Sequence, residues 1–532
     1  MKPRRSFGRT PRPIGTLGEN KSGQKENGSG NGLEADLEAN LRAISSLLGN
    51  PSDLAVRRLA LHGEPQPDIA VVYLASVVQS QEVSLTVIEP LLSLSHVSHE
   101  AQGEVAGPLE VLRLSLPTIH SIYEARSLKD LTAALLEGNV AILVDGEPAA
   151  LYFDAVRPPT RLYQVPTSET TVIGPQIGLV ESVDDNLALI RARIRHPRLR
   201  VEKHVIGRKS KTDVRLVYIE GVAPREVVDE LRRRLSEIDT DLILDTGMLR
   251  DLITDRPYSP FVMERMTERP DTVAAEINLG RIAILVEGSP FAMLVPSQFF
   301  TLIESAEDYY LNPLSASVLK VLRMFAYMLS VLATPLYVAI VNFHFELVPL
   351  PLLLNIAATQ EGVPFPLPFA AFITEVVLDI VREAGIRLPR QFGPVVSIFG
   401  AVILGQSAVQ AGFVPPGLII VAMMGTICSF AVPRAEKALA YRLIRFPLLL
   451  LGSILGFPGI TIGAVAFVYH VASLKTLGIP YAALYAPGQT TRLSRKMVKV
   501  SARHQPITRP LAQADRVRQG EVPEPRDPKA ND

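Results

Sequence analysis

The sequence contains a single cysteine, Cys428, among its 532 residues. One thiol cannot build an internal disulfide framework or supply a cysteine-based zinc or iron–sulfur site. The chain also has no excess of either charge, because 54 lysines and arginines balance 54 aspartates and glutamates. A dedicated nucleic-acid binder usually presents a strongly basic face or domain, so the charge balance argues against a nucleic-acid partner.

Charged residues are scarce, and long stretches of the second half have none. They make up 20% of the chain, whereas 47% is hydrophobic and the mean hydropathy is +0.22. Large soluble proteins rarely average so high, which indicates that part of the chain lies in lipid. The length of 532 residues also exceeds one ordinary soluble core, since domains typically contain about 100–200 residues. We therefore expect a membrane protein with a sizeable soluble part.

The two ends of the chain contain little that could form a core. Residues 1–33 are rich in lysine, arginine, glycine and proline and poor in large apolar side chains, so we expect a disordered basic arm. An apolar segment does not follow its basic start, which argues against a secretory signal. Residues 489–532 are expected to form a second disordered tail, which begins with six basic and no acidic residues at 489–512.

An internal repeat runs through the soluble part. Two pairs of segments recur at nearly the same offset, 142 and 145 residues: Gly138–Ala150 with Gly280–Ala292, and Asp68–Leu74 with Asp213–Ile219. Short apolar strand patterns alternate with helical patterns around them, which indicates an α/β arrangement. We therefore expect two similar α/β subdomains, 34–160 and 161–315, each ending in a hairpin. The cleft between such lobes could bind a ligand or could result from packing alone.

Residues 316–488 have the pattern of an all-helical transmembrane domain. Its hydrophobic segments lie at 324–343, 366–386, 393–413, 417–433 and 447–472. The first has no charge and is long enough to cross about 30 Å of hydrocarbon. The second carries three carboxylates and could be a polar-faced span, a re-entrant segment or an interfacial helix. The expected fold class is thus a duplicated α/β soluble domain followed by a polytopic transmembrane domain.

Basic residues beside these segments give a contradictory orientation. With the N-terminal part in the cytoplasm and 366–386 counted as a span, the last two basic loops, of which the second is Arg434–Arg445, lie inside but the basic tail lies outside. Leaving 366–386 out keeps the tail inside and places both loops outside. A re-entrant element would resolve the conflict, and Gly456-Phe457-Pro458-Gly459 should kink or break the segment 447–472.

Three acids in 366–386 are the most distinctive polar feature of the membrane half. Glu375, Asp379 and Glu383 are spaced i, i+4 and i+8, so on a helix they fall within an arc of about 80°. In lipid they would repel one another unless they meet water, cations or arginine. One interpretation is an acidic lining of an ion path. The other is the solvated face of an interfacial helix, with Arg382 and Arg387 nearby.

Other polar and small residues suggest structural roles. Pro335, Gly400, Gly405 and Pro458 suit helix kinks or close helix packing, which are common in membrane proteins. The sequence does not show a convincing nucleophile motif, metal-ligand set or phosphate loop. We therefore expect that the protein is not an enzyme and needs no cofactor or metal.

Several short motifs occur in a fixed order along residues 50–488. They are Gly174-Pro175, Glu181-Ser182, Asn186–Ile190, Thr267-Glu268-Arg269-Pro270-Asp271, Ile284–Ser289, Glu307-Asp308-Tyr309-Tyr310, Ile386-Arg387-Leu388-Pro389 and Gly478-Ile479-Pro480-Tyr481. Together they resemble the A subunit of the GerA family of spore germinant receptors. One departure is the Gly-Pro pair, around which the family more often has arginines.

The resemblance implies a multi-pass protein of the inner membrane of a bacterial endospore, with its N-terminal domain on the cytoplasmic (core) side. It implies two partners, a transporter-like B subunit that recognises the nutrient and a C lipoprotein. It also implies that A subunits form a homo-oligomer that conducts cations and triggers germination. The alternatives are a non-conducting membrane scaffold, or an accessory A-type homologue that modulates germination by binding partner proteins.

Overall fold

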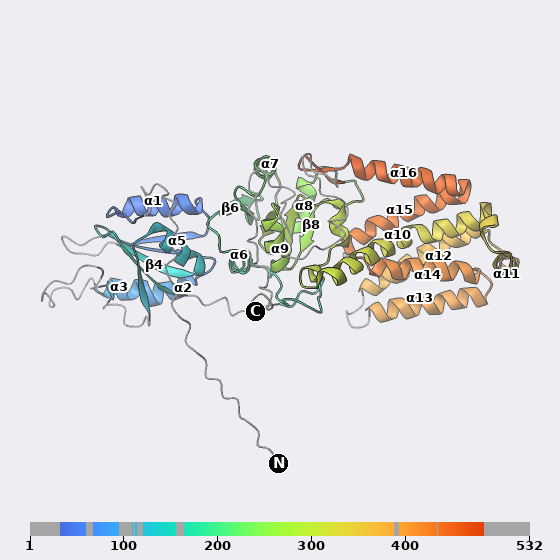
Figure 1. The fold of residues 1–532 in the computed structure, drawn as a ribbon, viewed down its shortest axis with the longest axis horizontal. Coiled ribbons are helices and arrows are strands. Elements are labelled where there is room, and N and C mark those ends of the chain that lie inside the picture. The colour runs from blue at the N-terminus through green and yellow to red at the C-terminus, as the bar shows by residue number, and fades with distance from the viewer. Residues whose placement is uncertain are drawn as a thin grey trace, which may run out of the picture.

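The structure, a computed structural model, describes residues 32–59, 68–94, 109, 112–113, 121–155, 164–387, 393–433 and 435–482. The expected basic arm, apart from Gly32 and Leu33, and the expected tail lie outside the described residues. Figure 1 shows two α/β lobes and a helical bundle arranged in a row. This arrangement confirms the expected fold class of a duplicated α/β domain followed by a helical part.

The first lobe contains a five-stranded antiparallel sheet in the order β1-β2-β4-β5-β3. Its strands are β1 (Leu54–Leu59), β2 (Ile69–Leu74), β3 (Ile122–Ala125), β4 (Asn139–Val144) and β5 (Ala150–Asp154). Its helices are α1 (Leu37–Leu48) and α5 (Leu128–Glu137) on one face, and α2 (Ser80–Val83) and α3 (Glu89–Leu94) on the other. Because both faces are covered, every residue of β2 and β4 is buried, and both strands are almost entirely apolar.

The second lobe repeats this design with the strand order β6-β7-β9-β10-β8. Its strands are β6 (Leu199–Ile206), β7 (Thr212–Ile219), β8 (Arg265–Thr267), β9 (Ile282–Val286) and β10 (Ala292–Val295). Its helices are α6 (Val183–Arg191) and α9 (Pro270–Asn278) on one face, and α7 (Arg225–Glu237) and α8 (Thr246–Ile253) on the other. The order of strands is therefore the same in both lobes.

The lobes also share individual hydrogen bonds. Asn40 in α1 and Asn186 in α6 each exchange two hydrogen bonds with the backbone of the residue six positions earlier. Asp145 and Glu287, which follow β4 and β9, each accept the first backbone amide of the same helices. The duplication read from the sequence offsets thus extends to the polar contacts that fix the first helix of each lobe.

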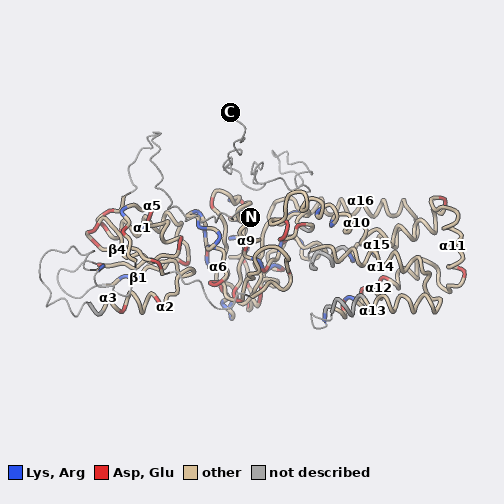
Figure 2. The backbone as a smooth tube through the Cα atoms, turned by 60° about the horizontal axis from the view of Figure 1, so that its bottom comes forward, with Lys and Arg blue, Asp and Glu red and all other residues tan. Residues whose placement is uncertain are grey.

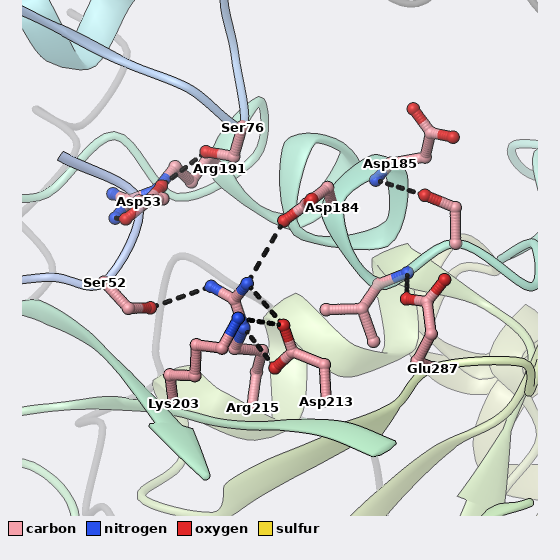
Figure 3. Close-up of polar contacts among 12 residues, drawn as sticks. Ser52, Asp53, Ser76, Asp184, Asp185, Arg191, Lys203, Asp213, Arg215 and Glu287 are labelled. Carbon is pink, nitrogen blue, oxygen red and sulfur yellow. Dashed lines mark hydrogen bonds and ion pairs between the residues drawn. The ribbon is translucent and has the colours of Figure 1, made fainter. Parts of the chain in front are cut away.

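Polar side chains join the two lobes (Figure 3). Asp53, just before β1, accepts hydrogen bonds of 2.7 and 2.8 Å from Arg191 of α6, and both side chains are buried. Ser76 also donates to Asp53, and Ser52 accepts from Arg215 of β7 at 2.8 Å. In the described part of the chain, the apolar clusters of each lobe contain no residue of the other. The lobes are therefore joined through polar contacts, with this buried ion pair among them, rather than through a shared apolar core.

The remaining described chain forms the helical bundle. Its helices are α10 (Pro313–Phe343), α11 (Leu350–Gln360), α12 (Leu367–Arg387), α13 (Gly393–Gln410), α14 (Pro416–Phe430), α15 (Ala435–Leu455) and α16 (Phe457–Ser473). Figure 2 shows that most charged residues lie in the lobes, whereas the bundle is largely uncharged. Among the described residues, α10 alone is both long and apolar enough to cross a membrane, and four further apolar helices are shorter.

The hydrophobic segment 447–472 is a pair of antiparallel helices. α15 ends at Leu455 and α16 starts at Phe457, and Gly456 between them has a positive φ of 64°, which favours glycine. A Cβ on Gly459 would lie 2.1 Å from the carbonyl oxygen of Leu451, so the two helices approach at a glycine. Because α16 starts at Phe457, Pro458 lies in its first turn, where proline is well tolerated. Because α16 reverses direction, it ends beside the second lobe, from which α10 starts (Figure 1).

A short hairpin after α16 packs into the second lobe. It consists of β11 (Lys475–Thr476) and β12 (Ile479–Pro480), with Leu477 between them. Leu477 is buried in the apolar cluster of α7 and α8, and its amide donates to Asp255 at 2.7 Å. The second lobe is therefore attached to the first helix of the bundle, α10, and to the chain that follows its last helix, α16.

Leu477→Ala should loosen this attachment. Removing buried side-chain atoms typically costs about 2–5 kcal/mol, so we expect a loss near the lower end of that range in the stability of the docked hairpin. Leu252→Ala is the matched control, because Leu252 on α8 is 46% exposed and its loss should cost less than about 1 kcal/mol. Limited proteolysis of the detergent-solubilised protein would compare cleavage after α16. Equal cleavage of the two variants would contradict the docking.

Candidate functional site

Charged side chains from α12 and α15 meet inside the helical bundle. Glu375 has no exposed surface, and its Oε2 lies 2.8 Å from Nη1 of Arg445, which is also buried. The hydroxyl of Thr334 on α10 donates to the other oxygen of Glu375 at 2.5 Å. One turn later, Asp379 lies 3.3 Å from Nη2 of Arg445 and 3.8 Å from Nη1 of Arg442. The acids of α12 thus neutralise the arginines of α15.

Helical spacing explains how these four groups meet. Residues four apart on α12 and three apart on α15 each project from one helix face, so two packed faces bring both pairs together. A lone charge in an apolar bundle is costly, and a paired one much less so. Arginine was one of the three partners expected for the acids. The loop expected at Arg434–Arg445 is wrong, because α15 starts at Ala435 and includes Arg442 and Arg445.

The third acid of the face lies on the surface. The side chain of Glu383 is 57% exposed and pairs at 3.0 Å with Arg387, one turn along α12. Arg382 points to α14 instead, where it donates to the carbonyl of Thr426 at 3.0 Å and lies 4.6 Å from the ring centre of Phe430. The acidic face read from the spacing therefore consists of the buried Glu375, the partly buried Asp379, both paired with arginine, and one exposed acid.

The residues expected to kink or pack helices lie at contacts within this chain. Pro335 is buried inside α10. A Cβ on Gly405 of α13 would lie 3.2 Å from Cγ2 of Ile419 on α14, and one on Gly400 would lie 3.7 Å from Cγ1 of Val381 on α12. These glycines therefore face neighbouring helices of the same bundle.

A second polar cluster holds residues 164–178, which we call the interlobe segment because they lead from the first lobe to α6. Glu268 and Arg269, just before α9, contact this segment. The carboxylate of Glu268 accepts the amide of Glu169 at 3.1 Å, and Arg269 donates to the carbonyl of Pro175 at 2.7 Å. Glu268 and Arg269 of the Thr267–Asp271 motif thus hold the interlobe segment in place.

The same cluster reaches the residues that precede α10. Asp271 accepts from Arg269 at 2.8 Å and from the hydroxyl of Tyr310, while Glu307 accepts the amide of Val172. Burial raises the pKa of Asp271, but the hydrogen bonds from Arg269 and Tyr310 outweigh it and hold that pKa below its usual value. Burial and the bond to Asp271 raise the pKa of Tyr310 to about 12. The interlobe segment is therefore connected to the start of α10.

Both clusters combine acids with arginines and hydroxyls, a composition typical of structural networks of ion pairs and hydrogen bonds. In the portion of the chain that is described, no group of three or more His, Cys, Asp or Glu side chains could hold a metal ion. What the clusters can do is hold α10, α12 and α15 in register and couple the lobes to α10. The sequence did not reveal these partners, although oppositely charged residues on two apolar segments are a usable signal.

The similarity of the chain to known proteins extends across the lobes and the bundle. A model of the family described as Bacillus/Clostridium GerA spore germination protein matches residues 42–511. Spore germination protein KA of Bacillus subtilis (strain 168) is 34% identical over 498 residues, which cover 93% of this chain and 90% of that protein. The uncharacterized membrane protein YfkQ of the same strain is 33% identical over 460 residues, which cover 86% and 87%.

One solved structure is also similar. It is the N-terminal domain of the A subunit of the Bacillus megaterium spore germinant receptor GerK3, with 30% identity and a TM-score of 0.40 over 50% of this chain and 97% of that one. The family match, in contrast, covers most of both lobes and all of the described bundle. With that extent and with full-length relatives above 30% identity, the chain belongs to the GerA family of spore germination proteins.

Proposed function

We propose that this chain is the A-type subunit of a nutrient germinant receptor and that it assembles into a cation-conducting channel in the inner membrane of a spore. The family match over residues 42–511 carries the proposal, because it includes the soluble lobes and the helical bundle together. The resemblance also supports a transporter-like B subunit and a C lipoprotein as partners. The nutrient signal would then reach the bundle through the contacts of the interlobe segment with α10.

A multi-pass topology with both ends on the core side fits this function. α10 starts at the second lobe and the hairpin after α16 returns to it, which requires an even number of passes. The start of α15, with Lys437 in its first turn, and the last described residue, Ala482, then lie on the lobe side. This placement agrees with the positive-inside rule and with a cytoplasmic N-terminal domain.

A non-conducting scaffold is the second candidate. The pairing of Glu375 and Asp379 with arginines favours it, because neutralised acids attract cations weakly. Deletion of the gene in the source organism, scored for germination on a panel of nutrients, tests the role in germination. Cation flux through the purified protein in liposomes separates a channel from a scaffold.

Glu383→Gln tests whether this acid lies beside the conduction path of the proposed channel. If the exposed Glu383 recurs once per subunit around a conduction path, it adds a ring of negative charge that concentrates cations. We expect its loss to lower cation flux roughly two- to five-fold at low ionic strength, and less at high salt because of screening. Protein levels should not change, since an exposed pair contributes little stability.

Glu361→Gln is the matched control, because Glu361 is an exposed acid at the opposite end of the bundle. Unchanged flux for Glu383→Gln would place Glu383 away from the conduction path, whereas absence of flux through the unchanged protein would favour the scaffold. The change of Glu375 and Asp379 to their amides is a poor test of conduction. It would leave Arg442 and Arg445 without counter-charges and destabilise the bundle.

A further inference from the structure

The first half of α10 exposes an apolar stripe. It consists of Leu314, Val318, Val321, Phe325 and Met328, which we call the α10 stripe. Successive members are 4, 3, 4 and 3 residues apart, and each is between 44% and 76% exposed. Alternating spacings of four and three are the heptad pattern of helices that pack side by side. The second half of α10 differs, because residues 330–339 are mostly buried in the bundle of the same chain.

Lipid does not account for the beginning of the stripe. The uncharged run of α10 starts at Met324, after Lys320 and Arg323, and from there to Phe343 it is long enough for about 30 Å of hydrocarbon. Arg323 pairs with Asp308 of the soluble part at 2.9 Å, which holds this level of the helix next to the second lobe. The first three residues of the stripe therefore lie outside the hydrocarbon, where contiguous exposed apolar side chains indicate an interaction surface.

We infer that the α10 stripe packs in parallel against the α10 stripe of a second copy of this chain. All copies enter the membrane in one orientation, so neighbouring α10 helices are parallel, and identical heptads complement one another. The residues that flank the stripe in the heptad are uncharged, which removes the like-charge repulsion that would oppose self-association: Ser315, Ser317, Leu322, Met324 and Leu329. The inference rests on the proposed oligomer and assigns its interface.

This assignment differs from the one suggested by small residues. The sequence offers Gly400–Ala411 of α13 as a packing face. In the structure, Gly405 of that face lies against Ile419 of the same chain, so part of the face is already used within the subunit. The members of the α10 stripe, in contrast, are 44–76% exposed in the described structure.

Disulfide cross-linking in membranes tests the contact. With Cys428→Ser as background, the full-length chain carries one new cysteine at a time: Val318→Cys or Val321→Cys on the stripe, and Lys320→Cys at the same depth off the stripe. Facing stripe positions of parallel helices bring Cβ atoms within disulfide range. We therefore expect both stripe variants to form at least roughly fivefold more disulfide-linked dimer than Lys320→Cys.

Native gel electrophoresis of the protein solubilised from the same membranes gives its oligomeric size. This measurement tests the proposed oligomer separately from the α10 interface. Oligomers together with stripe-specific dimers support the inference. Oligomers without stripe-specific dimers overturn the α10 interface and leave the proposed oligomer standing. Oligomers in which Lys320→Cys forms as much disulfide-linked dimer as the stripe variants have the same meaning. Monomers without cross-links overturn both. A stripe cysteine that links to a different protein also overturns the inference, because the stripe would then be the surface for another subunit.

Discussion

Arg445→Leu should destabilise the helical bundle by about 3–5 kcal/mol, because removing one partner of a buried ion pair leaves the other charge uncompensated. Glu375, with no exposed surface, would keep only the hydroxyl of Thr334, and Asp379 would keep only Arg442 at 3.8 Å. A loss of this size is a large part of the stability of a typical domain. We therefore expect little folded protein in the membrane.

Arg387→Leu is the matched control for this change. It removes an arginine from an acid of the same face, but the side chains of Arg387 and Glu383 are 77% and 57% exposed, so the cost should be at most about 1 kcal/mol. The double variant Arg445→Leu with Glu375→Leu replaces the ion pair by apolar groups and should recover much of the loss. Thermal unfolding in detergent measures all three. Equal melting of Arg445→Leu and Arg387→Leu would show that the pair is not buried.

Arg191→Met should release the first lobe from the second. Asp53 would remain buried with only Ser76 as a partner, and breaking a buried pair typically costs about 3–5 kcal/mol. Since the joint rests on polar contacts, we expect the lobes to separate while each keeps its own core. Hydrogen exchange should rise around residues 51–54 and 191 and stay unchanged within β2 and β7.

The control for Arg191→Met is Arg58→Met. Arg58 pairs with Glu38 inside the first lobe, and their side chains are 67% and 49% exposed, so its loss should cost at most about 1 kcal/mol. If Arg191→Met leaves exchange at the joint unchanged, other contacts hold the lobes together.

Sequence alone was sufficient for the features that depend on local patterns. The buried strands β2 and β9 are short apolar runs, and the repeat offsets identified two copies of one subdomain. The chain turns between Gln410, where α13 ends, and Pro416, where α14 starts, because proline cannot continue a helix but is favoured in its first turn. Periodicity also placed Glu375 and Asp379 on one face of α12.

The partners of these residues were decided by the tertiary structure. Helical spacing fixes the face on which Glu375 lies, but not which helix packs there, and Arg445 is 70 positions away in the chain. The break at Gly456 was expected, yet only packing of α16 back along α15 shows that the chain reverses and docks Leu477 into the second lobe. Local chemistry specifies helices, strands and turns, whereas the pairing of buried charges depends on contacts between elements that are distant in sequence.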